Sequence, residues 1–138
     1  MNNNITPAHV TYEQAVWLKS IGFDLPCNKM YGIDASLEYF DNSYGAGSLY
    51  RNSFNVDFIT AAPEQSVVVE WLRVNFGVNI QPFQVSIEND NYPLFYGEIN
   101  NNGVIIDGCL FGSWFETPQE AYSAALSYLM SNEIIKQK

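Results

Sequence analysis

Apolar and polar positions follow two different periods along this chain, and the clearest pattern lies near its end. Thr117 can cap the first free N–H groups of a helix, Pro118 fits the first helical position, and Glu120 completes a capping box. Apolar residues then recur at helical spacing, with Ser123 and Ser127 on the opposite side: Tyr122, Ala125, Leu126, Leu129 and Met130. The pattern predicts a helix within 116–130 that covers a sheet.

Two earlier segments have the same period. Thr11 and Gln14 form a second capping pair, and Gly22 ends a helix whose buried positions are Ala15, Leu18 and Ile21. A third helix begins around 62–65 and ends at Gly77, and its predicted apolar face is Val67, Val68, Trp71, Leu72 and Phe76. Its run of three valines lowers helix propensity, so packing must hold it.

The remaining apolar segments are short and strand-like. Residues 29–33 and 36–40 predict a hairpin, and 56–59 a short strand. Residues 80–88, 94–99 and 104–111 predict a three-stranded antiparallel meander, because Asn102-Gly103 is a strong hairpin signal. Alternation places Phe83, Val85 and Ile87 on one face of its first strand. The third strand is apolar on both faces apart from Asp107, which predicts a central or doubly covered position.

These elements predict an α+β fold. The expected order is helix, short strands, helix, meander and helix, with the last two helices covering the antiparallel sheet. A length of 138 residues and a hydrophobic fraction of 47% fit a single compact domain over 1–138 without metal or disulfide support.

Between the short strands, residues 41–55 are rich in Tyr, Asn, Ser and Gly. Recognition loops use this mixture, because tyrosine gives contact area at low entropic cost while small polar residues adapt. The candidate ligand- or partner-binding residues are Tyr44, Tyr50, Arg51 and Asn52. The alternative interpretation is a surface connection built from turn residues. Gly45 and Gly47 lack the third glycine and the strand-to-helix setting of a phosphate loop.

Charge is unevenly distributed. The formal net charge is −9, and no Lys or Arg occurs between Arg73 and Lys136. That span carries seven carboxylates: Glu88, Asp90, Glu98, Asp107, Glu116, Glu120 and Glu133. Such a field repels phosphate, so direct binding to nucleic acid or to an anionic membrane is disfavoured. Three interpretations of this negative charge remain: binding to a basic partner, imitation of nucleic acid, and simple solubility.

Groups that carry catalysis are sparse. His9 is the single histidine and Cys27 and Cys109 are the two cysteines, so neither a zinc site nor a disulfide framework is expected. A pair of carboxylates, Glu98 and Asp107, could face each other across a hairpin, although carboxylates on a solvated sheet are the ordinary case. We therefore expect no catalytic residues, no metal and no cofactor. With no signal peptide or membrane span recognisable, a cytoplasmic location in a bacterium or an infected host is expected.

Three segments together resemble small uncharacterised proteins of Bacteroidetes bacteria and their tailed phages: residues 11–27, 61–73 and 115–122. The resemblance implies a compact α+β domain and a phage or mobile-element context, and it carries no assigned activity. The segment 41–55 is longer than that family's pattern, which would make it the place of specialisation.

Three functional hypotheses follow. The first is a non-enzymatic binding protein that uses the loop at 41–55 to bind a protein partner or a small ligand. Such a protein could also form a homo-oligomer. The second is a phage anti-defence protein, either an acidic mimic of nucleic acid or a nucleotide sponge relying on Arg51 and Arg73. The third is a small enzyme that depends on a carboxylate such as Glu98 or on Cys27.

Overall fold

The computed structural model describes residues 8–39, 49–54, 59–85, 94–106 and 115–135. Helices and strands with antiparallel pairing confirm the α+β class. In chain order the elements are α1 (Tyr12–Ser20), β1 (Lys29–Tyr31), β2 (Leu37–Tyr39), η2 (Asn52–Phe54), β3 (Thr60–Ala61), α2 (Gln65–Phe76), β4 (Val78–Val85), β5 (Leu94–Asn101), β6 (Val104–Ile105) and α3 (Pro118–Ser131).

The chain divides into two compact units. The first unit comprises residues 1–64 and 136–138, and the second comprises 65–135. Each is described by itself, and the expectation of a single domain stays a prediction.

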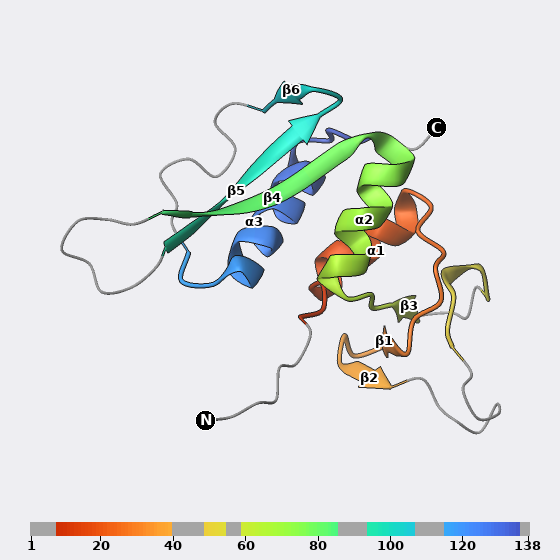
Figure 1. Ribbon diagram of the computed structural model, residues 1–138. Coiled ribbons are helices and arrows are strands. Elements are labelled where there is room, and N and C mark those ends of the chain that lie inside the picture. Colours follow the sequence, from red (N-terminus) through yellow and green to blue (C-terminus); the bar gives the residue numbers. More distant parts are fainter. Residues whose placement is uncertain (1–7, 40–48, 55–58, 86–93, 107–114, 136–138) are drawn as a thin grey trace. The chain divides into compact units, whose positions relative to one another are not determined.

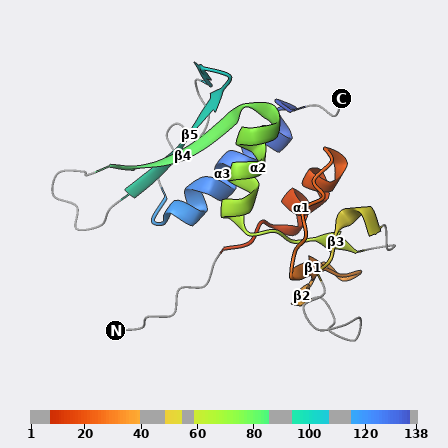
Figure 2. The same ribbon diagram turned by 45° about the vertical axis from the view of Figure 1, so that its right-hand side comes forward.

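In the first unit, three short strands form an antiparallel sheet in the order β2-β1-β3 (Figure 2). Met30 is opposite Glu38 on β2 and Ala61 on β3. The β1–β2 hairpin confirms the sequence prediction for 29–40. Residues 56–58 of the short strand expected at 56–59 lie outside the described ranges, and Ile59 is not part of a strand; β3 follows directly at Thr60–Ala61.

Helix α1 begins as the sequence predicts. The Gln14 N–H donates to Thr11 Oγ1 (3.2 Å), and the Thr11 N–H donates to Gln14 Oε1 (3.0 Å), which is a complete capping box. Ala15, Leu18 and Ile21 are buried, as expected. Val10, just before the helix, is tied by its N–H to Pro63 O (3.1 Å) and by its carbonyl to the Tyr31 hydroxyl (2.6 Å), so the helix start is fixed to β1 and to the end of β3.

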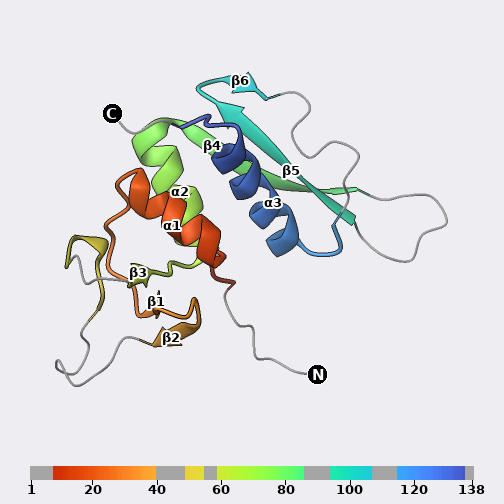
Figure 3. The ribbon, with the colours of Figure 1, turned by 180° about the vertical axis from the view of Figure 1, so that it is seen from behind.

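The second unit contains the antiparallel meander β4-β5-β6, which confirms the prediction for this part of the chain. Helix α3 packs against β4 and β5, and α2 packs against β4, as expected for the last two helices. In Figure 1 the sheet lies in front of α3, whereas Figure 3, the view from behind, shows α3 in front of the sheet. The helix layer therefore covers one face of the sheet.

The helix-covered face is apolar. Val78, Ile80 and Ile99 are at most 3% exposed, and from α3 the buried side chains are Ala121, Ala125, Leu126 and Leu129. At the start of α3 the Glu120 N–H donates to Thr117 Oγ1 (3.2 Å), and the Thr117 hydroxyl in turn donates to the Glu120 carboxylate (3.2 Å). Thr117 thus caps this helix as predicted, but the Glu120 carboxylate accepts from the Thr117 hydroxyl and not from the Thr117 N–H, so the reciprocal bond of the predicted capping box is not formed.

Two sequence interpretations in this unit are wrong. Val67 is 37% exposed and does not belong to the buried face of α2. The third strand is neither central nor doubly covered: β6 lies at the edge of the sheet, and both of its residues are exposed. Residues 107–111 of the predicted strand lie outside the described ranges.

Two glycines allow the β5–β6 hairpin to lie close to the start of β4. Asn102 (φ 54°) and Gly103 (φ 91°) are both left-handed, which is the backbone that a two-residue Asn-Gly turn requires. Gly77 (φ 70°) lies beside this turn, and a Cβ there would come within 2.1 Å of Asn102 Oδ1. Glycine therefore allows α2 to turn directly into β4 next to the β5–β6 hairpin.

Candidate functional site

The backbone of the second sheet determines which of its edges can accept another strand. The Asn102 N–H donates to Gly77 O (3.0 Å), and the β4–β5 register is continuous from Val78 to Val85. Because bonding alternates along an antiparallel pair, Val78, Ile80 and Pro82 direct their backbone groups away from β5. Pro82 has no N–H, so proline occupies an outward position on β4 and blunts that edge.

The opposite edge, β6, has no such protection. Ile106 N–H donates to Ile99 O (2.9 Å), and Asn100 is opposite Ile105. By the same alternation, the N–H and C=O of Ile105 point away from β5. Val104 is 67% exposed and Ile105 is 54% exposed, and no described strand pairs with the outer side of β6. Two β-branched apolar residues thus form an open edge.

On the face of this sheet away from the helices, the half nearest the β5–β6 turn is polar, and Phe83 lies farther along the same face. Asn79 is opposite Asn100, which is opposite Ile105, so these three side chains form one row across the sheet. Gln81 and Glu98 form the next row. Asn79 and Gln81 are exposed, while Glu98 and Asn100 are half-buried. We call Asn79, Gln81, Glu98, Asn100 and Ile105 the amide face; it presents hydrogen-bonding groups and one carboxylate beside the open β6 edge.

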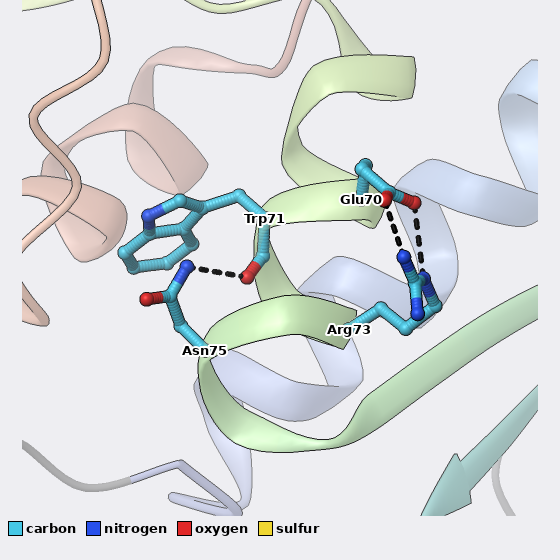
Figure 4. A network of polar contacts seen from close by, with 4 residues as sticks. All are labelled: Glu70, Trp71, Arg73 and Asn75. Atoms are coloured by element: carbon cyan, nitrogen blue, oxygen red, sulfur yellow. Dashed lines mark hydrogen bonds and ion pairs between the residues drawn. The ribbon is translucent and has the colours of Figure 1, made fainter.

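The unit that carries this face is strongly acidic. The second unit holds eight carboxylates and one cation, Arg73, so its formal net charge is −7. Arg73 forms a forked ion pair with Glu70 one turn earlier on α2, including a bond from Nε to Oε2 of 3.0 Å (Figure 4). The hydrogen bond from Arg73 lowers the pKa of Glu70. The single positive charge of the unit is therefore already paired.

Three of the four candidate residues predicted from the Tyr/Asn/Gly-rich segment are described, and these three do not form one exposed group. Tyr44 lies outside the described residues, and Arg51 is exposed. Tyr50 is 0% exposed and Asn52 is 8% exposed, so both belong to the core of the first unit. Ligand or partner binding by the four residues stays a prediction.

Tyr50 and Asn52 have a structural role instead. Cys27 and Tyr50 exchange two backbone hydrogen bonds of 2.8 Å, and the Tyr50 hydroxyl donates to Ile59 O (3.1 Å). The Asn52 amide donates to Phe23 O (2.8 Å) and accepts from the Ala61 N–H (2.9 Å). One amide thereby satisfies two buried backbone groups from distant segments.

The candidate nucleophile, Cys27, is buried beside this bridge. Burial, followed by the nearby charge of Glu64, raises its pKa to about 11. A thiol with that pKa is protonated at neutral pH and is a weak nucleophile. His9 forms an isolated β-bridge with Glu64 in the same unit. Cys109 and Asp107 lie outside the described ranges, so the carboxylate pair of Glu98 with Asp107 stays a prediction.

Sequence reasoning missed the amide face, although a signal was present. The segment Val78-Asn79-Ile80-Gln81 alternates strictly between apolar and polar residues, which is typical of a strand with one solvated face. Starting the strand at Ile80 instead of Val78 hid the first half of that pattern. Pro82 and Phe83 then break it, and the interpretation followed the alternation only from Phe83 onward.

Within the described ranges, no group of three or more His, Cys, Asp or Glu side chains is placed to hold a metal ion. No helix in the same ranges is both long and apolar enough to cross a membrane. Comparison with known proteins found no matching family model, no matching curated protein and no matching solved structure.

Proposed function

We propose that this chain is a non-catalytic binding protein whose second unit recognises a basic protein partner. The observation that carries the proposal is the amide face, a solvated sheet surface in a unit of net charge −7 whose one cation is internally paired. Asn and Gln side chains supply directional hydrogen bonds, while the surrounding carboxylates attract Lys and Arg and raise the association rate.

This proposal takes up two of the sequence hypotheses. A nucleic-acid mimic is the special case in which the basic partner normally binds nucleic acid, and the phage context implied by the sequence resemblance belongs to the same proposal. A nucleotide sponge has less support, because phosphate binding needs free cations and Arg73 is engaged with Glu70.

Panning a phage-displayed library of random peptides on the purified protein tests the proposal. We expect enrichment of Lys and Arg in the bound peptides. Their affinity should fall between about 0.1 M and about 1 M salt, because the Debye length shrinks from roughly 10 Å to roughly 3 Å. Selected peptides without basic residues, or affinities insensitive to salt, would overturn it.

A matched pair of charge reversals locates the surface. Glu98→Lys introduces a cation into the amide face, whereas Glu133→Lys makes the same change in net charge at an exposed position just after α3. We expect Glu98→Lys to weaken binding of the selected peptide about tenfold or more and Glu133→Lys about threefold or less, because screening limits the reach of a distant charge. Equal effects of the two variants would remove the amide face from the proposal.

A further inference from the structure

The two edges of the second sheet differ in the backbone groups that they offer to an added strand. On β4, Pro82 occupies a position whose N–H would point outward, so an added strand would lose a backbone hydrogen bond there. On β6, the outward position is Ile105, which keeps its N–H and C=O. Among the described strands, an added strand would therefore lose a backbone hydrogen bond at Pro82 on β4, whereas it would lose none at Ile105 on β6.

We propose that the basic partner binds as an added β-strand along the outer edge of β6; this inference rests on the proposed function. The backbone groups of Ile105 pair with the incoming strand, and the exposed side chains of Val104 and Ile105 supply apolar contact.

Charge and side-chain direction specify the chemistry of that strand. Ile105 shares a row with Asn100, and Glu98 lies in the next row of the same face. Successive side chains of a strand point to opposite faces, so every second residue of the added strand faces the amide side. We expect Lys or Arg at those positions and β-branched or aromatic residues on the other side of the added strand, in contact with Val104. A second copy of this chain is a poorer occupant, because both copies would bring a net charge of −9.

Backbone pairing is tested with Ile105→Pro and Ile105→Thr, using as probe the tightest Lys/Arg-containing peptide from the displayed library. Ile105→Pro removes the outward N–H, while the N–H of Ile106 that bonds to Ile99 is retained. Ile105→Thr keeps the N–H and the β-branch. We expect Ile105→Pro to weaken binding about tenfold or more and Ile105→Thr about threefold or less, because only the proline removes the backbone donor.

Two further measurements keep the test decisive if Ile105→Pro disturbs folding. In the wild-type protein, the Ile105 amide should exchange rapidly with solvent when free and become protected when the peptide is added. Pro82→Val restores an outward N–H on β4, and we expect it to leave peptide affinity unchanged within about twofold, because the partner uses the other edge.

The outcomes separate the two proposals. A basic peptide that binds Ile105→Pro as tightly as wild type, or leaves the Ile105 amide unprotected, overturns strand addition while the proposed function stands. Failure of all basic peptides to bind the wild-type protein overturns both.

Discussion

The two units of this protein differ in what holds them together and in what they offer to other molecules. The first unit carries seven carboxylates and five cations, and buried side chains such as Asn52 and Tyr31 bond to distant backbone groups. The second unit carries a net charge of −7 and is built on the continuous β4–β5 ladder. Hydrogen-bonding side chains are used for internal structure in the first unit, whereas on the amide face of the second those of Asn79 and Gln81 are exposed.

The largest effect is expected from Asn52→Ala in the first unit. Loss of the amide leaves Phe23 O and the Ala61 N–H without their partner, and each buried group left unpaired costs roughly 1–3 kcal/mol. We expect a loss of about 2–4 kcal/mol in the free energy of unfolding by urea. Ser53→Ala, at an exposed neighbour, is the control.

Hydrogen exchange makes this test local. Faster exchange in the first unit alone would show that the two units open independently, whereas uniform acceleration would show one cooperative structure. A change in stability below about 0.5 kcal/mol would contradict the bridging role of Asn52, since that is the ordinary range for surface substitutions.

A smaller loss is expected from Gly77→Ala in the second unit. The new Cβ meets Asn102 Oδ1 and the residue must keep a φ of 70°, so we expect destabilisation of about 1–2 kcal/mol in urea unfolding. Gly103→Ala, which has the positive φ but no atom within 4 Å of the added Cβ, isolates the backbone contribution. Adding Asn102→Gly to Gly77→Ala removes the clash. If that double variant gains nothing relative to the sum of its single effects, the steric explanation is wrong.

Cys27 reports opening of the first unit. In a Cys109→Ser background, we expect its buried thiol to react with iodoacetamide far more slowly in the folded protein than in urea. Its pKa rises from an ordinary 9.0 to about 11, so the protonated thiol stabilises the fold fully below pH 9, and this contribution is lost as pH rises through about 11. The stability difference between wild type and Cys27→Ala should shift over that window. Parallel pH curves for the two proteins would contradict this.

The smallest effect is expected from Glu70→Gln, because both members of the ion pair are exposed. The pKa of Glu70 is lowered by its hydrogen bond from Arg73, so the stabilisation is present above the ordinary pKa of a glutamate and is lost as pH falls through the folded value. We expect a decrease in Tm near the limit of detection at pH 7, and none in strong acid or high salt. A large decrease that persists in high salt would show a role beyond the ion pair. Glu116→Gln is the charge-matched control.

Local signals made much of the fold predictable. Thr11 with Gln14, and Thr117 with Glu120, define helix starts through bonds between residues three apart, and Asn102-Gly103 defines a hairpin through its backbone preference. Each of these devices acts within four residues of sequence, so no knowledge of distant contacts is needed to recognise it.

The candidate site was less predictable, because it depends on contacts between distant residues. Tyr50 and Asn52 have the composition of a recognition loop, and only their bonds to Cys27, Phe23 and Ala61 reveal a core role. Likewise, the edge position of β6 follows from which strands pair, whereas its apolar sequence is equally typical of a central strand.

Pro82 also bears on how far such a sheet could grow by self-association. Filaments built by strand stacking need two pairing edges on every subunit, one to accept a neighbour and one to pass the contact on. With Pro82 at an outward position of β4, a strand added there would lose a backbone hydrogen bond, whereas a strand added at β6 keeps the bonds of Ile105. One proline thereby disfavours continued growth of an assembly through this sheet, although the β6 residues are exposed.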